Sequence, residues 1–580
     1  MANYFLDNQD IQFLFDHFEL SELARLQEDR ARNGDADYVP QDADDAVDNY
    51  RRVLEIVGQL AADTLAPNAE QIDREGNTLN EDGTVTLHPL VRENLKRFVL
   101  AELTAFTSPR QYGGLNCPLL LYTMANEIVS RADCSFMNLF GLQGIADTLN
   151  AFASEEIKSE VLPRFARGEV TAAMVLTEPD AGSDLQAIRL RAYQNEQGQW
   201  LLNGVKRFIT NGCGEILLIL ARTEPEISDG RGLSLLLAER CERIKVRHLE
   251  EKLGIHGSPT CELVFDDAPA RLVGERQRGL ITYVMALMNG ARVSIAAQSL
   301  GVAEAAFRLA RVYAHTRHQF GGPIERLPAV AEMVTDMQIA IEAARALAYE
   351  TSAACDRENN NLRILETGLA RDKDEEKSRK QAARPLKRIN GMLTPMTKYY
   401  CSEMACRVAN DAIQVLGGSG YMKDYAAERY LRDARITTIY EGTSQLQVVA
   451  AVRGVASGTF ESYVAEHEKA ACSDPTLAAL KQKLVEAKTR VLEAIRFIKG
   501  RAAAYLDLSG RRLVDSAIFV IVGHLLLAQG AVNDRKKRVA RRFIESGLPV
   551  LAMSLEQAFA GDMSPMDEYD LLAGPVPARD

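Results

Sequence analysis

One carboxylate in the sequence has neighbours that a surface loop would not give it. Glu441 lies in IYEGTSQLQ, residues 439–447, between Ile439 and Tyr440 on one side and Gly442 on the other. A surface loop would surround the acid with more polar side chains. Apolar neighbours keep water away from a carboxylate and make it a stronger base. The stretch therefore raises the question of what this carboxylate does, with a helix-capping or solvated glutamate as the plain interpretation.

Two stretches earlier in the chain combine a strand with polar groups at its end. In MVLTEPDAGSD, residues 174–184, an apolar run leads into Thr177 and a turn. Such a turn can direct N–H groups and hydroxyls at an anion or at the edge of a heteroaromatic ring, although a plain turn is equally open. In KRFITNG, residues 206–212, Phe208 and Thr210 share one strand. Phe208 could stack on a flat ring, but most strand aromatics belong to the core.

Two further stretches have features that suit a large ligand. Arg317 opens RHQFGGPI, residues 317–324, after a long helical pattern. An arginine there either complements the helix dipole or binds a phosphate. The glycines of VLGGSGYM, from residue 415, allow close backbone approach to a ligand and lie about twenty residues before Glu441.

Hydrophobic periodicity divides the chain into helical and β regions. Apolar residues recur at three- and four-residue spacing up to about residue 170, and again from about residue 280. Short apolar or alternating runs fill the interval between them. The pattern predicts a mainly α protein with an embedded β domain. The predicted parts are an N-terminal helical domain 1–170, a β domain 171–278, a helical bundle domain 279–457 and a C-terminal helical extension 458–580.

Two local features carry separate predictions. Asn203-Gly204 stands between WLL and VKRFI, which is a strong hairpin signal. The charge-dense segment 370–388 contains Pro385 and is expected to be a surface insertion.

Composition excludes several classes of protein. The net charge of −12 and the pI near 5.4 argue against nucleic-acid binding, which needs a basic face. The nine cysteines are scattered without a C-x-x-C pair, so neither a disulfide framework nor a structural zinc site is expected. Reduced thiols of this kind suit the cytoplasm.

Membrane signals are weak. The first twenty residues mix acids into an apolar run, so no signal peptide is expected. The most apolar stretch, 516–532, falls short of the roughly 20 residues that span a bilayer. The basic cluster RKKRVARR, 535–542, follows it. A helix on a membrane surface and a core helix of a bundle both remain open, with the core helix favoured.

Four stretches, 174–184, 206–212, 317–324 and 415–447, the last of which includes Glu441, surround a β domain between helical ones. In this order they resemble the acyl-CoA dehydrogenase family over roughly residues 45–455. The segments on either side resemble the larger members. The resemblance implies a helical, β-barrel and four-helix-bundle architecture with a C-terminal helical extension. It also implies FAD as cofactor and oxidation of an acyl-CoA to the trans-2-enoyl-CoA, as in fatty acid metabolism and β-oxidation.

In family members with this motif, the glutamate removes the α-proton, and the β-hydrogen leaves as hydride to flavin N5. That implies Glu441 as the base. Ala291, in LMNGARV, occupies the place where some relatives carry the base instead, so no acid competes with Glu441. The Glu441 N–H and a ribityl hydroxyl of the cofactor would hold the thioester carbonyl.

The resemblance also implies binding residues, and no metal. The positions that match FAD contacts are Leu176, Thr177, Ser183, Phe208, Thr210, Arg317, His318, Gln319, Phe320, Gln414, Gly417, Gly418, Thr443 and Gln445. The positions that match substrate contacts are Ser183, Asn289, Arg292, Tyr440 and Gly442. The segment from Arg317 to Phe320 reaches FAD across a subunit interface in the family, which implies a homodimer or a dimer of dimers.

Electrons from the reduced flavin are expected to pass to an electron-transferring flavoprotein. Two alternatives stay open: an oxygen-using acyl-CoA oxidase, and a flavin-retaining relative that binds DNA through C-terminal helices. The expected location is cytoplasmic, with peripheral contact at the inner membrane face as an open addition. Phe136, Met137 and Phe140 lie where the floor of the acyl site is expected and would shorten it.

Overall fold

The computed structural model describes residues 2–28, 39–366, 368, 370 and 372–578 of the chain. Two compact units make up the chain. Unit 1 comprises Met1–Leu386 and Cys401–Ser444, and unit 2 comprises Lys387–Tyr400 and Gln445–Asp580. Each unit is described by itself.

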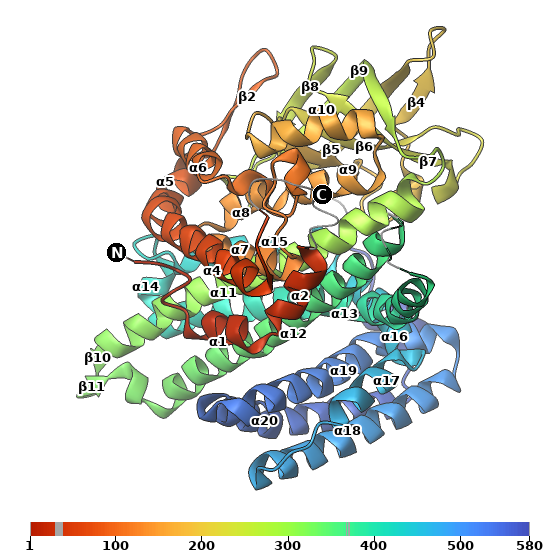
Figure 1. Cartoon of the computed structure of the whole chain (residues 1–580). Coiled ribbons are helices and arrows are strands. Elements are labelled where there is room, and N and C mark those ends of the chain that lie inside the picture. The colour runs from red at the N-terminus through yellow and green to blue at the C-terminus, as the bar shows by residue number, and fades with distance from the viewer. Residues whose placement is uncertain (1, 29–38, 367, 369, 371, 579–580) are drawn as a thin grey trace. The chain divides into compact units, whose positions relative to one another are not determined.

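Unit 1 begins with helices that precede the β domain (Figure 1). They are α1 Gln9–His17, α2 Leu20–Gln27, α4 Ala43–Leu60, η1 Ala61–Leu65, α5 Ala66–Glu75, α6 Pro89–Leu100, η2 Leu103–Ala105, η3 Arg110–Tyr112, α7 Leu119–Ala132, α8 Cys134–Gly141, α9 Gly144–Phe152 and α10 Glu155–Ala166. A two-stranded hairpin, β1 Thr78–Leu79 and β2 Val85–Thr86, interrupts them, so the expectation of helices alone before residue 170 was wrong there.

The β domain is a barrel. Its elements are β3 Ala172–Val175, η4 Leu185–Ala187, β4 Arg191–Gln194, β5 Trp200–Thr210, β6 Ile216–Arg222, η5 Gly230–Gly232, β7 Leu233–Glu239, β8 Ile244–Leu249 and β9 Thr260–Val273. Strands β6, β4, β5, β9 and β7 pair in that order, and β7 pairs again with β6, which closes the ring. Strand β3 adds to β6 and β8 adds to β9.

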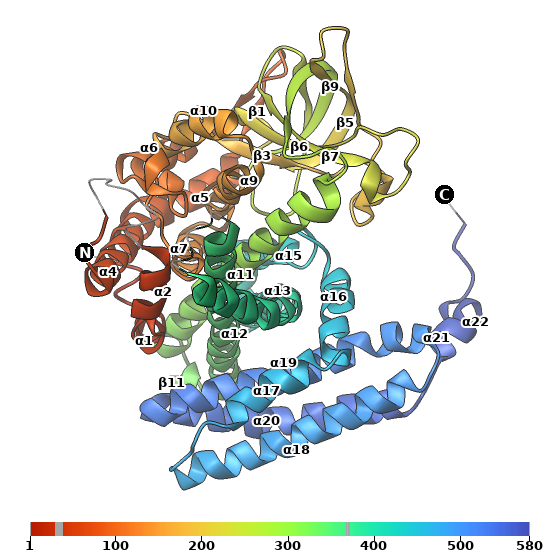
Figure 2. The ribbon, with the colours of Figure 1, turned by 45° about the vertical axis from the view of Figure 1, so that its right-hand side comes forward.

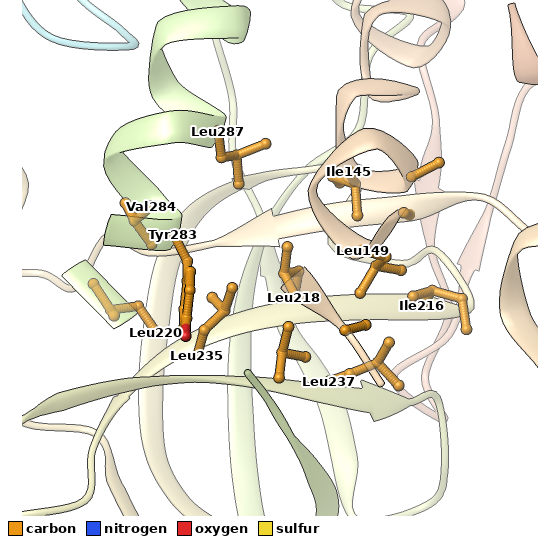
Figure 3. Packing of buried hydrophobic residues seen from close by; sticks show 14 of the residues in the cluster. Ile145, Leu149, Ile216, Leu218, Leu220, Leu235, Leu237, Tyr283, Val284 and Leu287 are labelled. Atoms are coloured by element: carbon orange, nitrogen blue, oxygen red, sulfur yellow. The ribbon is translucent and has the colours of Figure 1, made fainter. Parts of the chain in front are cut away.

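Strand β6 explains why the β domain has fully apolar runs. Leu217 and Ile219 point into the core of the barrel, and Ile216, Leu218 and Leu220 point to the opposite face. Figure 3 shows that outer face covered by side chains from α9 and from the helix that starts at residue 279. Because both faces are buried, successive residues of the strand are all apolar. A strand with one exposed face would alternate apolar and polar residues instead.

A second set of helices completes unit 1. Its elements are η6 Gly279–Val284, α11 Met285–Thr316, β10 His318–Gln319, β11 Gly322–Pro323, η7 Ile324–Arg326, α12 Pro328–Glu366, α13 Lys373–Leu416, α14 Gly418–Tyr421, α15 Ala427–Ile436 and the start of α16 Ser444–Ala456. Helix α13 contains the segment predicted to be a surface insertion. The described side chains of that segment are mostly exposed, and residues 373–388 are helical.

Unit 2 is helical. Besides parts of α13 and α16 it contains α17 Thr459–Glu468, α18 Pro475–Lys499, α19 Ala503–Val532, α20 Asp534–Phe559, α21 Ser564–Asp567 and α22 Tyr569–Ala573. The long helices α18, α19 and α20 run side by side (Figure 2). The side chain of Asn533 caps α20 by accepting the Lys536 N–H at 3.0 Å.

The prediction of a mainly α protein with an embedded β domain and C-terminal helices is confirmed, whereas the four-part division of the chain stays a prediction. Two helical segments are long and apolar enough to cross a membrane, Gly279–Thr316 and Ala503–Val532. The expectation that the stretch 516–532 is too short to span a bilayer was therefore wrong, because the helix that contains it, α19, has 30 residues. The most apolar window of α19 is 89% buried, as expected of a helix packed inside a bundle.

The hairpin predicted at Asn203-Gly204 was also wrong. Both residues lie inside the continuous strand β5, at a bulge opposite β9. Gly204 has φ of 139°, and a Cβ there would lie 3.3 Å from the Leu190 Cα. Glycine is therefore needed at position 204 because the strand is distorted there and lies close to Leu190, and not because the chain turns.

A buried arginine ties four helices of unit 1 together. Arg345 on α12 is 0% exposed, and its Nη1 lies 2.5 Å from Asp10 Oδ2 on α1. Its Nη2 lies 2.6 Å from Glu127 Oε1 on α7 and 2.8 Å from Glu304 Oε2 on α11. The Tyr349 hydroxyl donates to Glu127 Oε2 at 2.7 Å. The cluster joins segments more than 300 residues apart in sequence.

Replacing Arg345 with Met is expected to destabilise unit 1 by about 3–5 kcal/mol, because three buried carboxylates lose their shared cation. Urea unfolding followed by circular dichroism measures the shift of the first transition. Lys380→Met is the control, since Lys380 forms an exposed pair with Glu376 on α13, and its effect should stay within about 0.5 kcal/mol. Equal midpoints for Arg345→Met and the wild-type protein would contradict the expectation.

Candidate functional site

Glu441 lies in a tight loop between α15 and α16. It has a left-handed backbone with φ of 54°, and Gly442 follows with φ of 88°. For a residue other than glycine this conformation costs roughly 1–2 kcal/mol. The Ser444 N–H donates to the Thr438 carbonyl at 3.0 Å, and the Ser444 hydroxyl donates to Glu403 Oε1 at 2.6 Å. These bonds close the loop behind Glu441, whose side chain is half-buried.

Tyr440 anchors the other side of Glu441. Its hydroxyl donates to Gln298 Oε1 on α11 and lies 3.2 Å from Asn138 Oδ1 on α8. Burial, together with the nearby Cys134 and Glu441, raises the pKa of the Tyr440 phenol well above its usual value. The phenol therefore remains a hydrogen-bond donor, and the strained residue that follows it is held at both ends.

The half-buried Arg292 on α11 interacts electrostatically with Glu441. Burial lowers the pKa of Arg292 on α11, and the charge of Glu441 counteracts the shift. Arg292 Nη1 donates to Asn289 Oδ1 at 3.0 Å, while its buried Nε has no acceptor among the residues that the structure describes. The structure thus brings together the predicted residues Asn289, Arg292, Tyr440 and Glu441.

A buried ion pair fixes the predicted turn after β3. The Lys206 Nζ, on β5, donates to the Leu176 carbonyl at 2.7 Å and lies 3.0 Å from Glu178 Oε1. Glu178 in turn accepts the N–H groups of Arg189 and Leu190 at 2.8 and 2.9 Å. Burial lowers the pKa of Lys206 to about 8 although Glu178 opposes the shift. The turn that carries Thr177 is therefore held rigidly against β5.

Phe208 is displayed by a second bulge. Strand β5 has one more residue than β9 between the pairs Lys206–Leu263 and Ile209–Cys261. Phe208 lies in this bulge and has φ of 61°. Because Phe208 is 52% exposed, its ring is available for stacking. The preceding Arg207 donates its N–H to the Thr177 carbonyl at 2.9 Å. Thr177 and Phe208 therefore lie on adjacent segments.

The polar groups beside Phe208 are open to a ligand. The hydroxyls of Thr177 and Thr210 form no hydrogen bond within the described part of the chain, and both residues are half-buried. Leu176 is buried below them. Ser183 is exposed on the loop that follows the bridge between Glu178 and Ala181.

A junction connects the Glu441 loop to this edge of the barrel. The Ile255 N–H donates to Asp433 Oδ1 on α15 at 2.6 Å, five residues before Thr260, which pairs with Thr210. His256 beside it lies 3.0 Å from Asp73 Oδ1 through Nδ1 and 2.8 Å from the Lys252 carbonyl through Nε2. With acceptors at both nitrogens, the protonated ring fits this site best.

Charges at this junction shift two pKa values in opposite directions. The hydrogen bond with Asp73 raises the pKa of His256 to about 9 although burial opposes it. Burial would raise the pKa of Asp73, but hydrogen bonds from His256 and Arg432 hold it far below its usual value. The junction therefore contains a charged network near neutral pH.

The remaining predicted residues form a second group at the far end of α11 (Figure 1). Helix α11 has 32 residues and is about 48 Å long. Arg292 lies near its first turns, whereas the β10–β11 hairpin follows its last residue. The residues of this hairpin group are exposed: Arg317, His318, Gln319, Phe320, Gln414, Gly417 and Gly418.

The glycine loop belongs to this hairpin group. The Tyr313 hydroxyl, one turn before the hairpin, lies 3.3 Å from the Ser419 hydroxyl. Phe320 at the hairpin tip has φ of 52° and is 92% exposed. Within one chain, the hairpin group and the Glu441 group cannot contact the same end of one ligand.

Two predicted residues stay unassigned to either group. Thr443 is half-buried directly after Gly442, and Gln445 is exposed at the start of unit 2. Sequence reasoning missed Lys206, Glu178, Gln298, Asn138 and His256. Each of them has at least one partner that is 28 to 302 residues away in sequence, and no local pattern marks these pairs.

Comparison with known families matches most of the chain. The acyl-CoA dehydrogenase N-terminal domain matches residues 48–169, the middle domain matches 173–268, and the C-terminal domain matches 278–456. An acyl-CoA dehydrogenase of Bacillus subtilis (strain 168) is 36% identical over 359 residues, which are 60% of this chain and 86% of that protein.

Solved structures agree with this match. A chain from the study of the electron transferring flavoprotein of Acidaminococcus fermentans has a TM-score of 0.61 and 29% identity, covering 70% of this chain and 97% of that chain. An acyl-CoA dehydrogenase complexed with FAD from Bacillus anthracis has a TM-score of 0.75 and covers 90% of both chains. At 22% identity, the second likeness supports the fold alone, and it extends over the C-terminal helices.

The junction predicts a pH-dependent stability. His256 has a pKa of about 9 in the folded protein and about 6.5 when unfolded, so its protonation stabilises the fold fully below about pH 6.5. This contribution is lost as the pH rises through about 9. The melting temperature of wild-type protein minus that of His256→Gln should therefore be larger at pH 6 than at pH 9.5.

Differential scanning fluorimetry measures both temperatures. His248→Gln is the control, because His248 is half-exposed and 3.8 Å from Glu250. The melting temperature of the wild-type protein minus that of His248→Gln should not be larger at pH 6 than at pH 9.5. A His256→Gln difference that is constant or grows with pH would contradict the prediction.

Proposed function

The chain belongs to the acyl-CoA dehydrogenase family, and we propose that Glu441 is the base with which it dehydrogenates an acyl-CoA thioester. The observation that carries the proposal is the strained conformation of Glu441, fixed by Tyr440 on one side and Ser444 on the other. Strain maintained by such contacts is typical of functional residues. The Arg292 guanidinium nearby favours the ionised carboxylate, which is the form that accepts a proton.

The residues around Phe208 fit the flavin of FAD. An exposed aromatic ring on a bulge offers a stacking surface, and the unpaired hydroxyls of Thr177 and Thr210 offer polar contacts to a ring edge. Lys206 and Glu178 hold Thr177 in place without taking up its hydroxyl. When bound, FAD supplies the acceptor for the hydride that leaves the β-carbon.

The chain's own residues would then perform three tasks. Glu441 accepts the α-proton on its carboxylate, and the electron pair of that C–H bond becomes part of the new α,β double bond. The Glu441 N–H, in its left-handed turn, is the donor proposed for the thioester carbonyl oxygen. The bound acyl group and Tyr440 keep water away from the carboxylate. The product is the trans-2-enoyl-CoA.

We propose a homodimer or a dimer of dimers in which each FAD is bound by two chains. One chain would supply Thr177, Phe208 and Thr210, and the second would supply Arg317 and the loop at Gly417 and Gly418. The support is the length of α11, since about 48 Å separates its two ends. The exposed hairpin tip, with Phe320, is the segment available to reach a second chain.

The proposed electron acceptor is an electron-transferring flavoprotein, in agreement with the relative from Acidaminococcus fermentans. We propose a cytoplasmic location as well. Its support is the set of four buried cysteines that form no disulfide, Cys117, Cys134, Cys261 and Cys401.

Glu441→Gln should lower the rate of flavin reduction by acyl-CoA by about 10² or more, because the amide cannot accept the α-proton. Anaerobic stopped-flow spectroscopy at the flavin absorbance measures the rate. The variant should still bind FAD and acyl-CoA. Glu403→Gln, which alters the acid behind the loop, is the comparison, and it should have a smaller effect. Near-normal reduction by Glu441→Gln would overturn the assignment of the base.

Phe320→Ser should weaken subunit association and lower the FAD content, because the hairpin would lose its apolar tip. Light scattering after size exclusion and the ratio of flavin to protein absorbance measure both effects. Leu100→Ser is the control, since Leu100 is 69% exposed on α6 and lies outside the hairpin group. A wild-type protein that is monomeric yet retains one FAD per chain would contradict the shared site.

A further inference from the structure

Two cysteines meet at one end of the β domain. Cys261 on β9 pairs with Ile209 on β5 and is 0% exposed. The chain turns back directly after β5, because the Gly212 N–H donates to the Ile209 carbonyl at 3.1 Å. This turn brings the half-buried Cys213 to Cys261, and the Cys261 thiol donates a hydrogen bond to the Cys213 sulfur. Both thiols are free.

The fold itself holds the two thiols together. A Cβ at position 212 would lie 2.7 Å from the Cys261 Cβ, so only glycine fits there. The Asn211 N–H donates to the Pro259 carbonyl at 2.7 Å, which fastens the turn to the residues before β9. Asn211 Oδ1 also lies 3.8 Å from the Cys213 sulfur. The position of Cys213 is therefore set by the turn and by its neighbours.

A cation lies beside the pair. Arg240 Nε donates to the Gly214 carbonyl at 3.3 Å, and Arg240 Nη2 donates to the Gly212 carbonyl. These carbonyls belong to the residues on either side of Cys213. A nearby arginine favours the thiolate over the thiol, and the thiolate is the form that reacts with oxidants.

The two thiols differ in acidity. The hydrogen bond from Cys261 is the main cause that lowers the pKa of Cys213, and the charge of Arg240 adds to it. Burial and the Glu215 carboxylate oppose this shift. Donating the same bond, together with burial, raises the pKa of Cys261. Cys213 is thus the more reactive thiol, and Cys261 is a neutral thiol placed to resolve its oxidation product.

We propose that Cys213 and Cys261 form a reversible redox site that a hydroperoxide converts into a disulfide. The Cys213 sulfur attacks the terminal peroxide oxygen, the O–O bond breaks, an alcohol (or water, from hydrogen peroxide) leaves, and Cys213 becomes a sulfenic acid. The Cys261 thiol then attacks the Cys213 sulfur, and water leaves as the S–S bond forms. The two thiols lose two electrons, which the peroxide takes up.

This redox site does not rest on the proposed dehydrogenation. Disulfides that form among otherwise reduced thiols are usually transient and respond to oxidants, and a small thiol reverses them by exchange. The bond would join the turn after β5 to β9, directly beside the pair formed by Thr210 and Thr260.

Peptide mapping of the full-length holoenzyme tests the proposal. The protein is treated with one equivalent of hydrogen peroxide, alkylated, digested with trypsin without reductant and measured by mass spectrometry. Cys213 and Cys261 fall in separate tryptic peptides, 208–222 and 253–271, with one cysteine each. We expect these two peptides to be cross-linked at least about tenfold more than any other pair. Dithiothreitol should restore both thiols.

Single substitutions separate the two roles. Cys261→Ser should stop the reaction at the sulfenic acid of Cys213, which dimedone traps as an adduct. Cys213→Ser should leave Cys261 unmodified, because Cys261 is buried. Cys241→Ser is the matched control, since Cys241 is also a half-buried cysteine close to Arg240. It should leave the cross-link unchanged.

Three results would overturn the proposal. One is wild-type protein without the cross-link, or with Cys213 joined to Cys241 instead. Another is an equal yield of the dimedone adduct in wild-type protein and in Cys261→Ser, because Cys261 would then not resolve the sulfenic acid. The third is a cross-link that forms as readily in urea-unfolded protein, since the fold would then not direct it. If Cys261→Ser does not fold, Cys261→Ala is measured with the same expectation.

Discussion

The length of α11 determines which residues of unit 1 can share a ligand. One uninterrupted helix carries Arg292 in its first half and leads into the β10–β11 hairpin at its end, about 36 Å from Arg292. Helices α7, α12 and α15 pack along it, so it cannot bend to bring the two ends together. The candidate residues therefore fall into two groups for a physical reason. This separation is the physical basis of the proposal that two chains share one cofactor.

Backbone strain marks the tips of both groups. Glu441, Phe208 and Phe320 all have left-handed backbone conformations, which side chains other than glycine rarely adopt. Each conformation directs a side chain away from its own segment, and at Glu441 and Phe208 neighbouring hydrogen bonds hold it. Tyr440 and Ser444 flank Glu441, and the N–H of Arg207 is bonded to Thr177. Six other residues that are not glycine also have positive φ, so this strain does not by itself identify a contact with cofactor or substrate.

Local patterns in the sequence predicted the elements well but not the contacts between them. The apolar run of β6 and the long period of α11 follow from burial on both faces and from helical spacing. The Asn203-Gly204 pair led to a wrong prediction of a hairpin turn, because a bulge and a turn both require the backbone freedom of glycine. The motif residues near Glu441 were predicted from resemblance. Gln298 and Asn138 could not be, since their roles exist only once α8, α11 and the Glu441 loop are packed together.

The buried polar groups of unit 1 differ in how completely they are satisfied. Arg345 has carboxylate partners on Nε, Nη1 and Nη2, and the Lys206 ammonium has both Glu178 and the Leu176 carbonyl. Ion pairs of this kind rarely stabilise a fold more than apolar residues would, so their value lies in fixing segments in register. Asn138 has the same kind of surroundings but one end of its amide lacks a partner. Asn94 Nδ2 and Arg292 Nε are likewise buried without a partner among the described residues, so incomplete hydrogen bonding in unit 1 is not confined to Asn138.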